Sequence, residues 1–126
     1  MTRSVVLSPA APQPVSAYSQ AIQSGSLLFL AGQIPLDPTT GKLVSGSIAE
    51  ETDRIIENLR AVLSAAGATL DHVVKTTVYL TNMADFAAFN QAYARYFTKD
   101  PPARTTVAVA ALPLGARVEL EAIAAL

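Results

Sequence analysis

The chain has 126 residues, of which 51% are hydrophobic and 15% charged, and its formal net charge is −1. Length and composition predict one globular domain, residues 1–126, and the near-neutral balance argues against a general nucleic-acid binder, which needs a basic surface. The absence of cysteine excludes disulfides, thiolate catalysis and cysteine-ligated metals, and the single histidine, His72, excludes a metal site built on several imidazoles.

No segment of the sequence predicts export or membrane insertion. The apolar run near the N-terminus is too short for a signal peptide, and no stretch reaches the roughly 20 apolar residues that a membrane span requires. The lack of cysteine also fits a reducing compartment. The sequence therefore predicts a cytoplasmic protein.

The first third of the chain predicts loops and one hairpin. Pro9, Pro12 and Pro14 favour an irregular connection over residues 8–15. Residues 21–23 and 27–31 flank a Ser-Gly-Ser turn, which is typical of a β-hairpin. A second turn is predicted further on, where an Asp-Pro-Thr-Thr-Gly sequence follows.

The clearest predicted element is a helix that begins at Ser47. Ser47 followed by Glu50 is a capping-box pattern, and the acidic residues of the first turn suit the positive end of the helix dipole. Apolar residues then recur at helical spacing until Gly67, which supplies the stop.

The rest of the chain predicts three strands and a second helix. Strands are expected over residues 73–81, 105–111 and 117–125, with a helix from near Asn82 or Asp85 to the prolines at 101 and 102. This helix carries an aromatic stripe made of Phe86, Phe89, Tyr93, Tyr96 and Phe97. The order β-β-α-β-α-β-β indicates an α+β fold, with one mixed sheet and both helices on one face.

Two stretches of the chain, residues 4–36 and 105–116, contain no Asp, Glu, Lys, Arg or His. A small domain has too much surface to leave so much of its chain uncharged unless part of it is covered. Cover by other copies of the chain predicts an oligomer, which would also bury the second face of the sheet. A neutral polar surface rich in Ser and Gln is the alternative.

Common catalytic motifs are missing from the sequence. There is no Gly-rich phosphate loop, no His-x-x-x-His pair and no G-x-S-x-G elbow. Any Ser-His-Asp triad would have to use His72, and its place at the start of a strand favours a surface histidine instead.

The last predicted strand carries Arg117, Glu119 and Glu121 at alternate positions, so that all three share one face. The two carboxylates stand about 7 Å apart by the rise per residue. Two interpretations stay open. The strand is a solvent-facing edge with an Arg–Glu pair, or a carboxylate lines a wet pocket as a general base or a water-positioning group.

Arg104 precedes a charge-free strand and is either a surface residue or a receptor for an anion. A simple hairpin centred on Gly115 would pair Ala111 with Arg117 and Val109 with Glu119. Arg104 would then lie roughly 16 Å from the partner of Glu119 by strand rise. If both residues serve one site, a register shift or a neighbouring subunit must bring them together.

Several separated segments, in order along the chain, resemble the RidA/YjgF family. They are SAYSQA at 16–21, AGQIPLDPTTGKLV at 31–44, the segment 57–97 and PPARTTVAVAALPLGARVELEAIA at 101–124. The resemblance implies a chorismate-mutase-like α+β subunit that forms a homotrimer with sites between subunits. It also implies protection against metabolite damage, by hydrolysis of reactive enamines and imines such as 2-aminoacrylate and 2-iminobutanoate to 2-keto acids and ammonia, without metal or organic cofactor.

The same resemblance implies roles for individual residues. Arg104 would grip the substrate carboxylate with its planar guanidinium, and Glu119 would hold or activate the attacking water and shuttle a proton. Four further residues would line the site: Tyr18 from the adjoining subunit, Asn90 from the second helix, and Gly32 and Thr106 through close approach and amide contacts. Tyr79 and the helix aromatics would belong to packing.

Four departures from the family pattern touch the pocket wall. Ser16-Ala17 stands in place of Gly-Pro, Ala31 in place of Ser, Thr105-Thr106 in place of Ser or Ala followed by Cys, and Pro101 in place of an aromatic residue. These changes bear on substrate preference and leave Arg104 and Glu119 in place.

Three other functions stay open. The first is a non-catalytic trimer that binds small ligands or acts as a chaperone, and the second is a pathway-specific deaminase for an aminomuconate-type intermediate. The third is a translation inhibitor with ribonuclease activity, as family members have been described. The lack of a basic patch and of a histidine pair disfavours the third.

Overall fold

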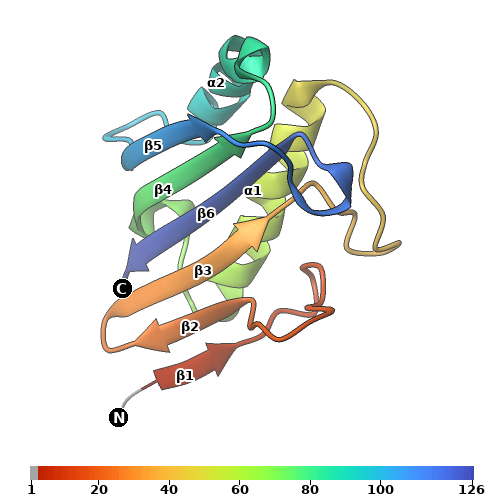
Figure 1. Ribbon diagram of the computed structural model, residues 1–126. Helices are drawn as coiled ribbons and strands as arrows, with labels where there is room; N and C mark the ends of the chain where they lie inside the picture. Colours follow the sequence, from red (N-terminus) through yellow and green to blue (C-terminus); the bar gives the residue numbers. More distant parts are fainter. Residues whose placement is uncertain (1–2) are drawn as a thin grey trace.

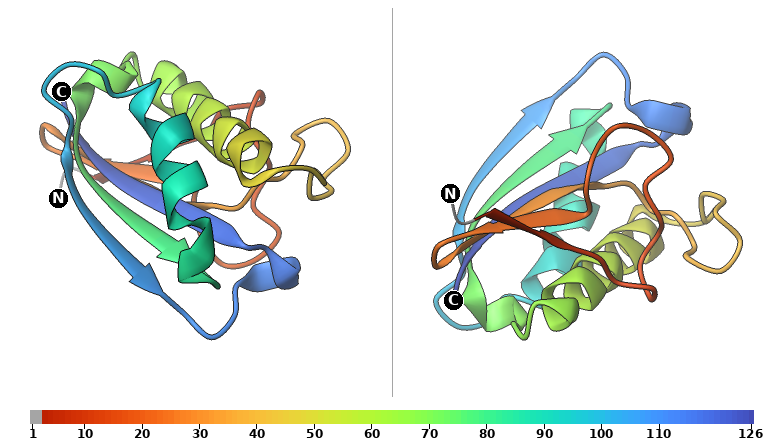
Figure 2. Two further views of the ribbon diagram at one scale, coloured as in Figure 1. Left: turned by 90° about the horizontal axis from the view of Figure 1, so that it is seen from above. Right: turned by 90° about the horizontal axis from the view of Figure 1, so that it is seen from below.

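The computed structural model describes residues 3–126 and consists of a six-stranded sheet with two helices packed on one face (Figure 1, Figure 2). In chain order the elements are β1 (Arg3–Val6), β2 (Ala21–Ser24), β3 (Leu27–Gln33), α1 (Ile48–Ala65), β4 (Val73–Leu80), α2 (Phe86–Ala94), β5 (Ala103–Ala108) and β6 (Val118–Ala125). Single 3-10 turns lie at Leu70–His72, Met83–Asp85 and Pro113–Gly115. In this part of the chain, neither helix combines the length and apolar character that crossing a bilayer demands.

The strand order is β1-β2-β3-β6-β4-β5, which puts the C-terminal strand in the middle of the sheet (Figure 1). Neighbouring strands are antiparallel except β4 and β5, which run parallel because α2 carries the chain back between them. The predicted hairpin between the last two strands is therefore wrong. The chain after β5 passes over the end of β4, where the Val109 amide donates to the Leu80 carbonyl at 2.8 Å and the Thr81 amide donates to the Arg117 carbonyl at 3.1 Å.

The other predicted elements are present, with shifts at their ends. The hairpin of β2 and β3 turns at Gly25, whose φ of 60° is readily adopted by glycine. α2 ends at Ala94, before the prolines, so Tyr96 and Phe97 of the aromatic stripe lie in the loop that follows. β1 is not predicted, because its four residues become a strand through pairing with β2.

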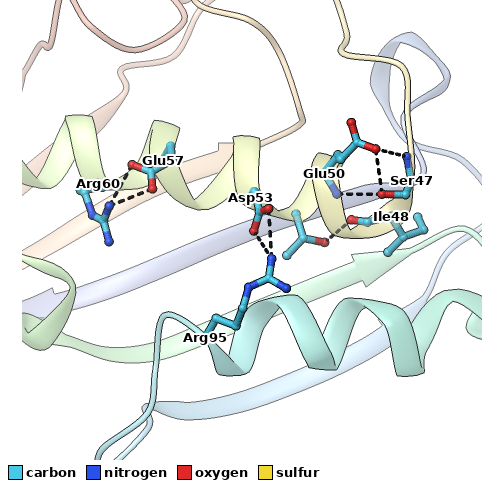
Figure 3. Close-up of polar contacts among 8 residues, drawn as sticks. Ser47, Ile48, Glu50, Asp53, Glu57, Arg60 and Arg95 are labelled. Atoms are coloured by element: carbon cyan, nitrogen blue, oxygen red, sulfur yellow. Dashed lines mark hydrogen bonds and ion pairs between the residues drawn. The ribbon is translucent and has the colours of Figure 1, made fainter.

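α1 begins as its sequence predicts, and it is tied to α2. The Glu50 amide donates to Ser47 Oγ at 3.1 Å and the Ser47 amide donates to Glu50 Oε1 at 3.4 Å, which completes the capping box (Figure 3). Arg95, just after α2, donates to both carboxylate oxygens of Asp53 on α1, at 2.8 and 3.1 Å (Figure 3). The two helices therefore form one layer on the sheet.

The hydrophobic core lies between the helix layer and the sheet. Its largest fully buried side chains include Phe89 of α2, Ile55 of α1, and Leu28, Val78 and Leu120 of the sheet. Each strand turns alternate residues to the opposite face of the sheet. Neither α1 nor α2 covers that face, which is called the open face below (Figure 2).

The open face carries an apolar row across four strands. Val5, Ile22, Phe29 and Ile123 are register partners, and Val5 and Phe29 are 64% and 43% exposed. An exposed apolar row of this kind is typical of a surface that contacts another protein chain. It agrees with the expectation of an oligomer, which stays a prediction.

Candidate active site

Glu119 stands on the open face of β6, beside a β-bulge in β3. The register of these strands shifts between Leu30 and Gln33, so β3 accommodates one extra residue there. Gly32 lies in the bulge, and a Cβ atom on it would overlap Glu119 Oε2 and approach Glu119 Cδ to 3.0 Å. The absence of a side chain at position 32 therefore leaves room for the Glu119 carboxyl group.

Glu119 and Tyr18 line one cavity of about 460 Å³. The cavity is formed by the loop before β2, the bulge of β3 and the turn before β6, and Val15 and Leu114 are among its apolar lining residues. Among the described residues that line it, Glu119 is the one with a carboxyl group. Three residues expected in the site, Tyr18, Gly32 and Glu119, thus come together at one end of the open face.

The surroundings of Glu119 favour its protonated form. Burial raises the pKa of Glu119, and the neighbouring Glu121 adds a smaller electrostatic contribution in the same direction. The Tyr79 hydroxyl donates to Glu121 Oε1, and this hydrogen bond is the main cause that raises the pKa of Tyr79. A carboxyl group with a raised pKa is suited to take up a proton and release it again during a reaction.

Arg104 lies on the other side of the sheet, near the start of β5 and against α2. Its guanidinium carbon is 4.9 Å from the centre of the Tyr93 ring and 5.7 Å from the centres of the Phe86 and Phe89 rings. Within residues 3–126 it forms no ion pair. Because aromatic rings attract a guanidinium without neutralising its charge, Arg104 keeps the capacity to bind an anion.

Asn90 and Thr106 belong to the same region as Arg104. Asn90 and Arg104 line a second cavity of about 460 Å³ between α2 and the loop before β5. Thr106 is two residues beyond Arg104 on β5 and therefore shares its face. Asn90 Oδ1 and Thr106 Oγ1 are buried and have no hydrogen-bond partner among the described residues. Such atoms are costly in a folded chain, and a bound ligand or an apposed subunit is one way to satisfy them.

The two groups of residues lie on opposite faces of the sheet. Arg104 is the register partner of Thr76, whose hydroxyl is hydrogen-bonded to the Tyr93 hydroxyl of α2 at 2.7 Å. Glu119 is the register partner of Tyr79, three residues further along β4. An odd separation along a strand puts two side chains on opposite faces. Of the two routes that the sequence leaves open for joining Arg104 and Glu119, a register shift is excluded and a neighbouring subunit remains.

The sequence predicts that Arg117 lies on the last strand and shares a face with Glu119 and Glu121, and this prediction is wrong. β6 begins at Val118, and Arg117 instead pairs with the carboxylate of Glu51 on α1 and donates to the Gly46 carbonyl at 2.8 Å. The interpretation of Glu119 as part of a solvent-facing edge strand is also wrong, because β6 is flanked by β3 and β4.

His72 has a structural role, in line with the expectation for a histidine at the entry to a strand. Its Nδ1 accepts a hydrogen bond from the Thr69 amide at 3.0 Å and so helps to close the turn before β4. In the part of the chain that the structure describes, no group of three or more His, Asp or Glu side chains is arranged to hold a metal ion.

Sequence reasoning missed the aromatic surroundings of Arg104. The spacing of Phe86, Phe89 and Tyr93 is the signal that places their rings on one side of α2, but the sequence does not reveal which strand lies against them. Tyr79 is a second omission. It lies on the open face opposite Glu119, and its hydroxyl donates to Glu121 Oε1, so its side chain is not in the core.

Comparison with known proteins gives the family of the chain. Residues 8–126 match the family model described as Endoribonuclease L-PSP. A RutC family protein of Pyrococcus abyssi is 50% identical over 124 residues, which cover 98% of either chain. The 2-iminobutanoate/2-iminopropanoate deaminase of Mus musculus is 46% identical over 122 residues, or 97% of this chain and 90% of that protein. This chain belongs to the RidA/YjgF family.

Solved structures of RidA/YjgF proteins share the fold. RidA from the Antarctic bacterium Psychrobacter has a TM-score of 0.94 and 37% identity, covering 98% of this chain and 99% of that one. TdcF of E. coli, in a crystal structure with bound serine, has a TM-score of 0.93 and 33% identity, with 98% of both chains covered. The mixed sheet with both helices on one face is thus the fold of the family.

Proposed function

We propose that this protein hydrolyses reactive 2-imino and 2-enamino acids, such as 2-iminobutanoate and 2-aminoacrylate, to 2-keto acids and ammonia. The observation that carries the proposal is the division of two complementary groups between the two faces of one sheet. An arginine that forms no ion pair with any described residue lies on one face, and a partly buried glutamate with a raised pKa lies on the other. The name of the mouse relative, a 2-iminobutanoate/2-iminopropanoate deaminase, supports the same reaction.

Arg104 is proposed to bind the substrate carboxylate. Its guanidinium is fixed by three aromatic rings and can present two parallel N–H donors to the two carboxylate oxygens. Asn90 and Thr106 are proposed to complete this half of the site. The unpaired side-chain oxygens of these two residues suit donors on a substrate or on a neighbouring subunit.

Glu119 is proposed to position and activate the attacking water. As the water oxygen bonds to the carbon of the protonated imine, one water proton passes to Glu119 and the nitrogen becomes an amine. Glu119 then returns the proton to this nitrogen, the C–N bond breaks and ammonia leaves. The remaining hydroxyl loses its proton to the ammonia, so that the products are a 2-keto acid and ammonium. A raised pKa makes Glu119 a stronger base for the first transfer.

The complete site is proposed to form between copies in a homotrimer, with Arg104 from one copy and Glu119, Gly32 and Tyr18 from the next. The opposite placement of Arg104 and Glu119 requires a second chain, and the apolar row of the open face would supply the contact. In such a ring each copy gives one half to the site on either side of it.

The test is the rate of keto-acid formation from 2-aminoacrylate and 2-iminobutanoate generated by a dehydratase, above the rate without this protein. We expect Arg104→Ala to lower kcat/KM by about 10²-fold or more, because the charge-assisted carboxylate contact is lost. Arg60→Ala, which removes an exposed arginine paired with Glu57, is the matched control and should keep the wild-type rate. No acceleration by the wild-type protein, or full activity of Arg104→Ala, would overturn the proposal.

A ligand-binding protein without catalysis is the second candidate, favoured by the serine bound in the TdcF structure. Calorimetry with a 2-keto acid separates the two: Arg104-dependent binding without imine hydrolysis would favour the second candidate. The substrate panel should include an aminomuconate-type imine, which would reveal a pathway-specific deaminase. RNA cleavage, which the description of the family model names, is disfavoured by the net charge of −1 and serves as a negative control.

A further inference from the structure

A second carboxylate stands beside Glu119 and has no part in the reaction as proposed above. Glu121 is two residues along β6 on the same open face, and the Tyr79 hydroxyl on β4 donates to its Oε1. Tyr79 is at the same time the register partner of Glu119. Glu119, Glu121, Tyr79 and Gly32 line one cavity of about 390 Å³. The phenol thus fixes the second carboxylate within the same cavity as the first.

Few other charges of the described chain act on this pair. On β4, Lys75 Nζ donates to the Thr76 carbonyl of the same strand and to Thr105 Oγ1 of β5, both at 3.0 Å. The segment 105–116, which borders the cavity, contains no acid or base, and the bulge of β3 adds none. Arg117 is engaged by Glu51 of α1. Among residues 3–126, the ionisable groups that line a cavity together with Glu119 are therefore Glu121, Tyr79 and, from the loop before β2, the phenol of Tyr18.

We propose that Tyr79 and Glu121 are positioning residues for Glu119, and that they hold a fixed negative charge beside it so that Glu119 retains the proton taken from water until it passes to the leaving amine. The inference rests on the proposed function, since it assigns Glu119 the two proton transfers of imine hydrolysis. Two carboxyl groups in different settings, one hydrogen-bonded and one partly buried in an apolar cavity, commonly divide into a fixed anion and a proton carrier.

The expected pH dependence follows from the sign of the interaction. Glu121 raises the pKa of Glu119, so its removal lowers that pKa and makes Glu119 a weaker base. Because the first transfer needs ionised Glu119, the acid limb of the kcat profile then moves to lower pH, while kcat at neutral pH falls about threefold. The KM is unchanged, because Glu121 does not bind the substrate carboxylate. Arg104 of a neighbouring copy is present in every variant, so its effect on the pKa of Glu119 is the same in all of them and does not alter the comparison.

The experiment compares wild type with Glu121→Gln, with Glu121→Asp, which keeps the charge, and with Glu57→Gln. The last variant removes an exposed carboxylate of α1, which packs on the opposite side of the sheet. The kcat profile is measured with 2-iminobutanoate after the uncatalysed rate at each pH is subtracted. A shift of the acid limb in Glu121→Gln, with near-normal limbs in Glu121→Asp and Glu57→Gln, supports the proposal. An unshifted limb in folded Glu121→Gln overturns it.

A second readout does not depend on activity. The side-chain carboxyl resonances of ¹³C-labelled glutamate are titrated by NMR, with the Glu119 signal identified by its loss in Glu119→Gln. The midpoint for Glu119 should move to lower pH in Glu121→Gln; an identical midpoint overturns the inference. If Glu121→Gln does not fold, the wild-type curve decides, because coupled carboxyl groups titrate in two steps and independent ones in one. Absence of hydrolysis by wild type would overturn the proposed function alone and leave this titration able to test the coupling.

Discussion

The helix side and the open side of the sheet carry functional groups of different kinds, a guanidinium on the first and a carboxyl group on the second. On the helix side, Arg104 is fixed against three aromatic rings, near two buried oxygens that have no hydrogen-bond partner within residues 3–126. On the open side, Glu119 fits above Gly32 in a largely apolar cavity. The charge of Arg104 suits the proposed binding of an anion, and the raised pKa of Glu119 suits the proposed transfer of a proton.

The difference teaches that neither half is a site by itself. A guanidinium without a second group can bind a carboxylate but offers no base, and a half-buried glutamate without a cation has nothing to hold an acidic substrate. Because β4 runs between β5 and β6, the sheet itself keeps the halves apart within one chain. The proposed site therefore requires an assembly of copies to bring the two groups together.

The largest expected effect comes from mixing two inactive variants. Arg104→Ala lacks the first half and Glu119→Gln lacks the second, so each alone should be nearly inactive. Refolded together at equal amounts, they should recover about a quarter of the wild-type activity, because every mixed trimer contains one site with both residues intact. The measurement is the rate of keto-acid formation from 2-iminobutanoate.

Mixing Arg104→Ala with Arg104→Gln is the control for this experiment. Both variants lack the same half, so no mixture of them can contain an intact site. A site contained within one chain would leave both mixtures equally inactive, and that result would contradict the division of the site between copies.

A smaller effect is expected from Gly32→Ala. The added Cβ would displace the end of the Glu119 side chain, which is flexible enough to move without unfolding the protein. A misplaced catalytic group commonly costs on the order of 10²-fold, so kcat should fall by about that factor while the melting temperature stays close to that of wild type. Gly25→Asn, in the turn between β2 and β3, is the control and should keep kcat, because asparagine tolerates a positive φ. A normal kcat in Gly32→Ala would contradict the proposed role of Glu119.

The smallest expected effect separates function from stability on the helix side. Thr106→Val removes a buried hydroxyl that has no hydrogen-bond partner in the described chain. This substitution should raise the free energy of unfolding by about 1 kcal/mol, while KM for the imino acid increases. Thr76→Val, on the neighbouring strand, removes a hydroxyl bonded to Tyr93 at 2.7 Å and should lower that free energy by about 1–2 kcal/mol. Chemical denaturation of both variants checks the pair. If both substitutions lowered the free energy of unfolding equally, the Thr106 hydroxyl would have a hydrogen-bond partner like that of Thr76, and the prediction would be wrong.

Local features of the fold could be predicted because their causes lie within a few residues. The capping box of Ser47 and Glu50 is complete in sequence, and it forms as expected. The turn at Gly25 and the aromatic stripe of α2 depend equally on short-range spacing. β1, in contrast, could not be foreseen, because its backbone groups are satisfied by β2 rather than by any pattern of its own.

Apart from the hairpin of β2 and β3, the neighbours of the strands could not be predicted from the sequence. The turn around Gly115 resembles a hairpin, yet the chain crosses the end of β4 there, and backbone bonds from Val109 and Thr81 fix that crossing. The same limit applies to Arg117, whose partner Glu51 is distant in sequence and lies on another element. Such pairings depend on which surfaces are buried together, and the same series of predicted strands is often compatible with several different pairings.

By itself, the sequence determined the types of all helices and strands except β1, the two candidate residues Arg104 and Glu119, and the resemblance that suggests their chemistry. The tertiary structure alone decided that these residues face opposite sides of the sheet, that Gly32 makes room for a carboxyl group, and that Tyr79 contacts Glu121. The physical reason is that the sequence gives the type of each side chain, whereas strand order and register decide which face of the sheet it lies on and which residues surround it.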